Sequence, residues 1–128
     1  LTQLHKGDRV VVKGSSMRRR DLIYVEDVAT AIVQTLIRPT ARGQIINIGS
    51  GFAVTIGEMI NLLCDALKRP RSVIEIIEEA GTTGDPASNI ADIAKMRKIL
   101  DFEPEFGPEA GLQALVAARM ASMDQTNI

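Results

Sequence analysis

Arg20 is the residue of this sequence best placed to bind an anionic group. It stands directly before a short apolar run, residues 22–25, so its guanidinium is expected at the edge of a buried strand. A guanidinium that neighbouring core residues hold in one orientation can bind a phosphate through two parallel hydrogen bonds. The spacing leaves one alternative open, a structural ion pair of Arg20 with Asp21 or Glu26.

A second candidate is the polar loop at residues 78–88, in which Thr82, Gly84 and Asp85 occur together. The loop has no apolar periodicity, which is typical of a surface loop that carries function. A loop carboxylate beside a glycine can accept hydrogen bonds from the hydroxyl groups of a sugar or ribose. The alternative for Asp85 is a turn or helix-capping aspartate.

Other polar or reactive side chains are expected to have structural roles. Arg18 and Arg19 are predicted to lie in a solvated turn. Cys64 falls in an apolar helical stripe and is predicted to be buried and unreactive. His5 has no partner at metal-ligand spacing, so no metal site is predicted.

The glycine turn at residues 49–51 (GSG) has the form of a dinucleotide-binding fingerprint, because it follows a predicted strand and opens a predicted helix. Two residues oppose that interpretation. Val54 stands where the third small residue should be, and Glu58 places a carboxylate at the helix N-terminus, where it would repel a pyrophosphate. A tight strand-to-helix turn is favoured, and a minimal dinucleotide binder is the less favoured hypothesis.

The composition favours a single domain over residues 1–128, with a frayed tail at 122–128. Lys plus Arg number 15 and Asp plus Glu number 16, so the net charge is −1 and no broad nucleic-acid surface is expected. The single cysteine allows no internal disulfide and favours a cytoplasmic location. No apolar run approaches the ~20 residues that a membrane-spanning helix needs.

Apolar periodicity and turn residues predict a small mixed α/β domain with short strands and about four helices. The strands are expected at residues 9–13, 22–25, 45–48 and 73–77, and the helices after Asp27, after Thr55, at 93–100 and from Pro108. Thr55 and Glu58 are expected to form a capping box. The order strand, helix, strand over residues 45–77 predicts a right-handed parallel βαβ unit.

The first and last of these four helices are each expected to bury one apolar face. Asp27 is the predicted N-cap of the first helix. The side chains predicted to be buried are Val28, Ala31, Ile32 and Leu36 in the first helix, and Leu112, Leu115, Val116 and Met120 in the last.

Several segments occur in an order that is specific as a set. They are RDLIYVEDV at residues 20–28, INIGSG at 46–51, the helix start TIGE at 55–58, Gly84-Asp85, and ADIAKMRKIL at 91–100 followed by Pro104. In this order the chain resembles the C-terminal, substrate-binding part of the extended short-chain dehydrogenase/reductases, the NAD(P)-dependent sugar-nucleotide epimerases and dehydratases. The resemblance covers the chain from about Gly7 to about Ala117.

The resemblance implies that Arg20 contacts the diphosphate of a nucleotide-activated sugar and that Asp85 contacts its nucleotide. Thr82 stands where the family often has an arginine, and Leu22 stands where it usually has an aromatic residue. These departures leave the nucleotide open among the UDP, GDP and dTDP types, and the sugar and the reaction type stay open as well.

The resemblance also implies an N-terminal half with a Rossmann fold, which holds NAD or NADP and carries a catalytic Tyr-x-x-x-Lys pair. In this sequence the only tyrosine is Tyr24, and Val28 stands where the lysine would be. A phenol without a positioned lysine is a poor general base at neutral pH. The chain alone is therefore expected to have no catalytic residue and to bind no cofactor.

Two functions from different classes follow. The leading hypothesis is a substrate domain that binds the nucleotide-diphosphate part of a sugar nucleotide and works with the missing Rossmann domain. The alternative is a non-enzymatic α/β interaction module that forms a homo-oligomer through an exposed sheet face. The apolar content of 45% in an apparently incomplete fold motivates that alternative.

Overall fold

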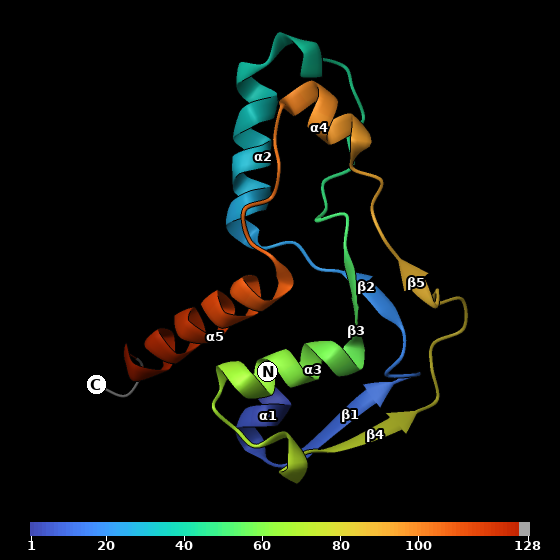
Figure 1. Ribbon diagram of the computed structural model, residues 1–128, viewed down its shortest axis with the longest axis vertical. Helices are drawn as coiled ribbons and strands as arrows, with labels where there is room; N and C mark the ends of the chain where they lie inside the picture. Colours follow the sequence, from blue (N-terminus) through green and yellow to red (C-terminus); the bar gives the residue numbers. More distant parts are fainter. Residues whose placement is uncertain (126–128) are drawn as a thin grey trace.

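The computed structural model describes residues 1–125 of the chain. Its elements are α1 (Thr2–Lys6), β1 (Arg9–Lys13), β2 (Arg19–Asp21), α2 (Val25–Ile37), β3 (Ala53–Thr55), α3 (Ile56–Ala66), β4 (Glu75–Glu79), β5 (Ser88–Asn89), α4 (Ala94–Leu100) and α5 (Pro108–Gln125), with 3-10 turns at Pro39–Ala41 and Arg71–Val73. Figure 1 shows an elongated molecule with α2 and α4 at one end and α1, α3, β1 and β4 at the other. The fold is the predicted small mixed α/β arrangement.

The strands form two small sheets, one at the end of the molecule that contains α1 and one nearer its middle (Figure 1). In one sheet β1 pairs with β4 in parallel, with Arg9 opposite Glu75 and Lys13 opposite Glu79. In the other sheet β2 is the central strand, antiparallel to β3 and parallel to β5. The central strand carries Arg20, so both of its edges are covered by short strands at that position.

The predicted βαβ unit over residues 45–77 is wrong. Residues 45–48 form no strand, and β3, which leads into α3, pairs with β2, whereas β4 pairs with β1 in the other sheet. The prediction failed because the apolar side chains of Ile46 and Ile48 pack against a hydrophobic cluster, while their backbone pairs with no strand. The strand predicted at residues 22–25 is also wrong: the strand β2 ends at Asp21, and Val25 already begins α2.

Helix α3 forms as predicted because its start is encoded locally. The Thr55 side chain accepts a hydrogen bond from the backbone N–H of Glu58, and the Glu58 carboxylate accepts one from the backbone N–H of Thr55. The Glu58 carboxylate also accepts a hydrogen bond from the Thr55 hydroxyl at 2.9 Å, and the two hydrogen bonds donated to it by Thr55 lower the pKa of Glu58. Cys64 lies fully buried on the apolar face of the helix, and its burial raises the pKa of its thiol, as expected for a core cysteine.

Each end of the molecule has its own hydrophobic cluster. The larger cluster joins α3 and α5 to β1, and it includes Ile60, Leu63 and Val116. The smaller cluster lies between α2 and α4 and includes Met96 and Leu100, both fully buried. Whether residues 1–128 form one independent domain stays a prediction.

Asp27 is not the N-cap of α2. The N-cap is Tyr24, without a side-chain capping bond, and Asp27 lies inside the helix with only 3% of its surface exposed. Its carboxylate accepts hydrogen bonds from the backbone N–H groups of Glu105, at 2.9 Å, and Phe106, at 3.1 Å. The carboxylate therefore ties α2 to the segment that leads into α5, a partner 78 residues away that no local pattern could indicate.

The predicted buried faces are only partly buried. On α2, Ala31 is fully buried, but Ile32 is 53% exposed and Leu36 is 81% exposed. On α5, Leu112 and Val116 are buried, whereas Leu115 is 46% exposed and Met120 is 44% exposed.

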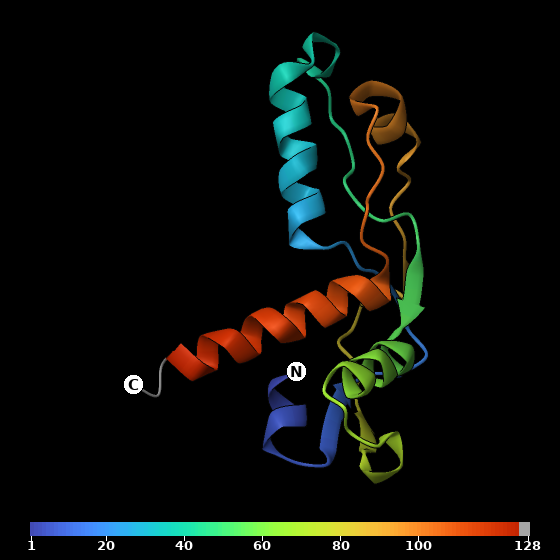
Figure 2. The same ribbon diagram turned by 60° about the vertical axis from the view of Figure 1, so that its left-hand side comes forward.

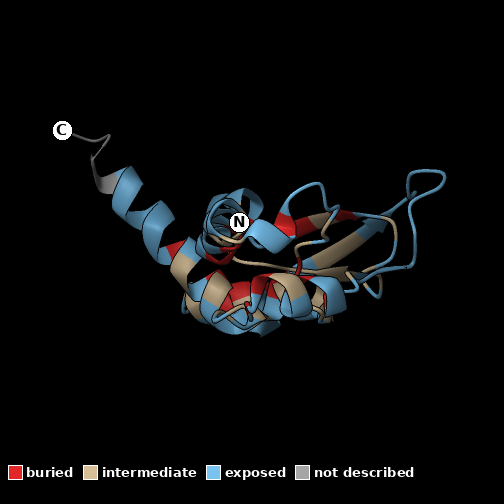
Figure 3. Cartoon of the chain, turned by 90° about the horizontal axis from the view of Figure 1, so that it is seen from above, coloured by how far each residue is buried: buried red, intermediate tan, exposed pale blue. Residues whose placement is uncertain are grey.

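Helix α5 extends away from the other elements toward the C-terminus (Figure 2). Residues 117–123 are exposed, as the pale blue turns in Figure 3 show. Within the segment predicted to fray, residues 122–125 continue the helix, and residues 126–128 lie outside the described part of the chain.

Candidate functional site

A pocket of about 210 Å³ opens beside the central strand β2. It is lined by Arg20, Asp21, Ile23, Ile48, Gly49, Asn89 and Ala91. The lining comes from β2, from the glycine turn before β3, and from β5 with the residues that follow it. One cation, one carboxylate and one amide thus converge on a small, partly apolar space, the pattern of a site for a polar ligand.

The guanidinium of Arg20 is held in one orientation by its neighbours. Its Nη1 donates to the carbonyl oxygens of Arg19, at 2.8 Å, and Pro86, at 3.0 Å. Its Nη2 donates to Oδ1 of Asp85 at 2.5 Å, and the side chain is 24% exposed. A guanidinium has five N–H donors, so these three hydrogen bonds leave two donors for another partner.

Asp85 lies next to Arg20, but the ion pair differs from the one that the sequence suggested. Arg20 pairs with Asp85 rather than with Asp21 or Glu26. The second oxygen of Asp85 pairs with Arg18, whose side chain is only 16% exposed, so the prediction of a solvated turn is wrong for Arg18.

Thr82 belongs to the same loop as Asp85. Its carbonyl accepts a hydrogen bond from the backbone N–H of Asp85 at 3.1 Å, and the residue is exposed. Neither Thr82 nor Asp85 lines the pocket that contains Arg20. The structure therefore brings all three predicted site residues into one region but places only Arg20 on the pocket wall.

Asp21 is an organising residue that the sequence analysis missed. Its carboxylate accepts hydrogen bonds from the backbone N–H of Ser50 at 2.8 Å, of Gly51 at 3.1 Å and of Ala91 at 3.1 Å, and from the Ser50 hydroxyl at 2.5 Å. Partial burial by itself raises the pKa of Asp21, but these hydrogen bonds outweigh it and lower the pKa below its ordinary value of 3.8.

The same contacts argue against dinucleotide binding at the glycine turn. A dinucleotide fingerprint offers free backbone N–H groups to a pyrophosphate, but here two of those groups already donate to Asp21. Gly51 has φ of +75°, and a Cβ there would lie 2.8 Å from the Cδ1 of Ile93. The turn is a structural junction, as favoured over a dinucleotide site, but it is not the predicted strand-to-helix turn. Residues 45–48 form no strand, and β3 separates the turn from α3.

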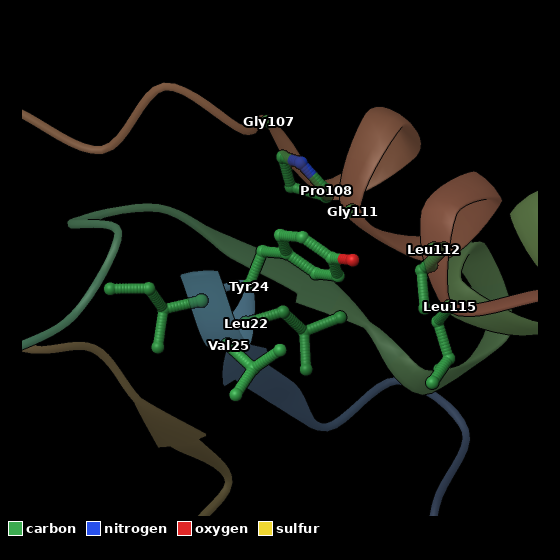
Figure 4. A pocket seen from close by; sticks show the side chains of 9 residues that line it. Leu22, Tyr24, Val25, Gly107, Pro108, Gly111, Leu112 and Leu115 are labelled. Carbon is green, nitrogen blue, oxygen red and sulfur yellow. The ribbon is translucent and has the colours of Figure 1, made fainter. Parts of the chain in front are cut away.

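A second pocket, of about 270 Å³, is almost entirely apolar. Figure 4 shows Leu22, Tyr24 and Val25 on one side of it and the first turns of α5 on the other. The Tyr24 ring packs against Phe106 with 4.6 Å between the ring centroids. This pocket has no charged lining residue, so of these two pockets only the one at Arg20 suits an anionic ligand.

Two searches of the described residues bear on other site types. Within residues 1–125, no cluster of three or more His, Cys, Asp or Glu side chains is arranged to hold a metal ion. Likewise, none of the helices in this range combines the length and hydropathy that crossing a membrane would require.

Comparison with known proteins finds relatives in one family. The model of the NAD-dependent epimerase/dehydratase family matches residues 1–49. The low-salt glycan biosynthesis protein Agl12 of Haloferax volcanii is 32% identical over 110 residues, which cover 86% of this chain and 34% of that protein. The dTDP-glucose 4,6-dehydratase of Streptomyces griseus is 28% identical over 117 residues, 91% of this chain and 35% of the enzyme.

The fold agrees with these matches. The crystal structure of UDP-glucose 4-epimerase from Thermotoga maritima, with UDP-glucose, superposes with a TM-score of 0.81 at 25% identity, over 92% of this chain and 37% of the epimerase. Over most of its length the chain is thus similar to proteins of the NAD-dependent epimerase/dehydratase family. It corresponds to the C-terminal portion of these proteins and spans about a third of the length of the curated relatives that it matches. Solved family members are complexed with NAD or NADPH.

Proposed function

We propose that this chain binds the diphosphate of a sugar nucleotide through Arg20, as the substrate-binding part of an NAD(P)-dependent sugar-nucleotide epimerase or dehydratase. The observation that carries the proposal is the pair of unused N–H donors on a guanidinium that is fixed at the wall of a pocket. Relatives in solved structures were crystallised with UDP-glucose and with UDP-glucuronic acid, which supports a nucleotide-diphosphate ligand.

The other residues around the pocket have distinct parts in this proposal. Asn89 supplies an amide that can donate to and accept from a hydroxyl or a base. Asp85 and Thr82 act at the rim, where Asp85 orients Arg20 and its remaining exposed carboxylate surface faces the nucleotide. Asp21 fixes the glycine turn, which contributes Gly49 to the pocket lining, through its hydrogen bonds to the backbone of that turn.

The chemistry of the parent enzyme is proposed to come from a Rossmann half that holds NAD or NADP. That cofactor would supply the hydride transfer, and this chain would bind and orient the sugar nucleotide. In this chain Tyr24 packs its ring on Phe106 and has no lysine four residues later. The proposal therefore assigns no catalytic step to this chain alone, and it retains a cytoplasmic location.

An exposed apolar face on α2 supports a protein partner at that helix. Its residues are Val25, Ile32, Val33, Leu36 and Ile37, each more than half exposed. A face of this kind marks a surface that another protein part covers. In the leading proposal the Rossmann half covers it. In the alternative, a non-enzymatic module would use the same helix to form a homo-oligomer, since this apolar surface lies on a helix rather than on a sheet face.

The leading proposal is tested by titrating the ¹⁵N-labelled chain with UDP, UDP-glucose, the matching GDP and dTDP ligands, and uridine, followed by NMR. Diphosphates are expected to shift the amide signals of the pocket residues. Arg20→Gln should weaken UDP binding about tenfold or more, because a hydrogen bond to a charged group contributes about 1.5–3 kcal/mol.

Arg9→Gln is the charge-matched control, because Arg9 is exposed and pairs with Glu75 in the other sheet. It should leave UDP binding unchanged. Equal affinity for UDP and uridine, or equal binding by the wild type and Arg20→Gln, would contradict the role of Arg20. Light scattering tests the alternative: concentration-dependent dimers that Leu36→Lys abolishes would favour the interaction module.

A further inference from the structure

Arg18 is held as firmly as Arg20, although it lies outside the pocket. Its Nε donates to the carbonyl oxygen of Ser15 at 3.2 Å, its Nη2 donates to the carbonyl oxygen of Lys13, and its Nη1 pairs with Asp85. Through this ion pair, the connection between β1 and β2 is bound to the loop that carries Asp85. A side chain with three fixed contacts and 16% exposure is not a solvated surface arginine.

Gly14 provides the space in which this guanidinium lies. Its φ is +85°, and a Cβ built on it would lie 2.6 Å from the Cζ of Arg18. The Cα of Gly14 also lies against Gly81, at 3.2 Å from the position where a Cβ of Gly81 would be. The backbone at Gly14 therefore packs closely against both the Arg18 guanidinium and Gly81, in the loop before Asp85.

Asp85 divides its two oxygens between the two arginines. Oδ1 pairs with Arg20 and Oδ2 pairs with Arg18. The three side chains together carry a net charge of +1, whereas Asp85 and Arg20 alone would carry none. Arg18 thus lets the carboxylate orient Arg20 without cancelling its charge. An anion that approaches the pocket then meets a cation in a fixed orientation, which is the condition for strong recognition of a phosphate.

We propose that Arg18 is a positioning residue: it holds Asp85 away from full pairing with Arg20, and so keeps Arg20 both oriented and cationic toward a phosphate group in the pocket. This inference rests on the proposed diphosphate-binding function and deepens it. Arg18 itself does not contact the ligand. Without it, the carboxylate of Asp85 would be free to pair with Arg20 alone, and an incoming phosphate would have to compete with it.

The test uses Arg18→Gln, alone and combined with Asp85→Asn, with affinities for UDP measured by NMR titration. Arg18→Gln should weaken UDP binding roughly threefold or more while uridine binding stays unchanged, as expected for groups coupled in one ion-pair network. Adding Asp85→Asn to Arg18→Gln removes the competing carboxylate and should restore part of the lost affinity. A merely structural role of Arg18 predicts no such rescue, so a double variant that binds as weakly as the single variant, or more weakly, would overturn the proposal.

Gly14→Ala gives the same perturbation without changing any charge. It should displace the Arg18 guanidinium and weaken UDP binding in the same direction as Arg18→Gln. Gly43→Ala is the matched control, because Gly43 also has a positive φ, of +70°, but no atom lies within 4 Å of its Cβ position. Equal effects of the two alanines on UDP affinity would show that backbone strain is the cause and would count against Arg18.

A ligand-independent measurement separates this inference from the proposed function. The ¹⁵Nε–Hε signal of Arg20 should move in Arg18→Gln and stay in place in Arg9→Gln. If that signal moves but the wild type binds no UDP, the diphosphate-binding function fails while the coupling of Arg18 to Arg20 stands. If the signal does not move, Arg18 does not position Arg20, whatever the ligand.

Discussion

Asp21 and Asp85 both flank Arg20, but they hold the chain through different kinds of donor. Asp21 accepts three backbone N–H groups and the Ser50 hydroxyl, all from segments that it locks together. Asp85 accepts hydrogen bonds from the guanidinium groups of Arg18 and Arg20, and its side chain is about one-third exposed. Backbone donors cannot move without unfolding their segments, whereas arginine side chains can change partners. The Asp21 junction therefore serves the fold, and the Asp85 junction is suited to respond to a ligand.

The largest expected effect is the loss of the Asp21 junction. Asp21→Ala leaves the N–H groups of Ser50, Gly51 and Ala91 without their acceptor, and each unsatisfied donor costs about 1–3 kcal/mol. The free energy of unfolding should fall by about 3 kcal/mol or more, measured by urea denaturation. Asp85→Ala should lower it by less than about 1 kcal/mol, because its ion pairs are partly exposed. If the two variants lost similar amounts of unfolding free energy, Asp21 would contribute no more to the stability of the fold than Asp85.

A smaller effect is expected from acid. Because the pKa of Asp21 is lowered in the folded chain, the native state binds this proton less readily than the unfolded state. The stabilisation from Asp21 is therefore complete above the ordinary value of 3.8 and is lost as the pH falls through the lower folded pKa. Urea midpoints measured between neutral pH and pH ~2 should show a shallower acid-side decline in Asp21→Asn than in the wild type. Parallel pH profiles would show that Asp21 does not contribute.

The smallest expected effect is the response of the two junctions to ionic strength. Raising the ionic strength from about 0.1 M to 1 M shortens the Debye length from about 10 Å to about 3 Å. The affinity difference for UDP between the wild type and Arg18→Gln should shrink, because the partly exposed ion pairs of Asp85 are partly screened. The stability difference between the wild type and Asp21→Ala should stay nearly constant, because short hydrogen bonds to backbone amides are little screened. Chloride and sulfate salts should be compared, to exclude competition by the anion for Arg20.

Several predictions from the sequence are confirmed because their causes lie within a few residues. The capping box of Thr55 and Glu58 starts α3, and Pro108 starts α5, as their local patterns indicate. The small mixed α/β class and the family follow from an ordered set of such local segments. Arg20 and Asp85 were both selected from the sequence as site residues; the structure places them in contact, and their roles in binding stay a prediction.

Other predictions failed where the partner is distant in the sequence. From sequence spacing, Asp21 and Glu26 were the expected ion-pair partners of Arg20, because spacing indicates only nearby partners. The partner in the structure is Asp85, 65 residues away. Asp27 has the residue type of an N-cap, but tertiary packing uses it inside α2. The apolar residues Ile32 and Leu36 have helical spacing, but spacing alone does not say whether this chain covers that face.

The sequence by itself determined the starts of α3 and α5 and the resemblance to the family, because these depend on residue type and short-range order. The choice of Arg20 as the phosphate ligand stays a prediction. Only the tertiary structure decided which carboxylate holds which donors. Asp21 meets backbone amides 29 to 70 positions away, and Asp85 meets Arg18 across 67 positions. Such pairs are brought together by the packing of β2 between β3 and β5 and by the fit of the Arg18 guanidinium over Gly14, and no local pattern encodes either.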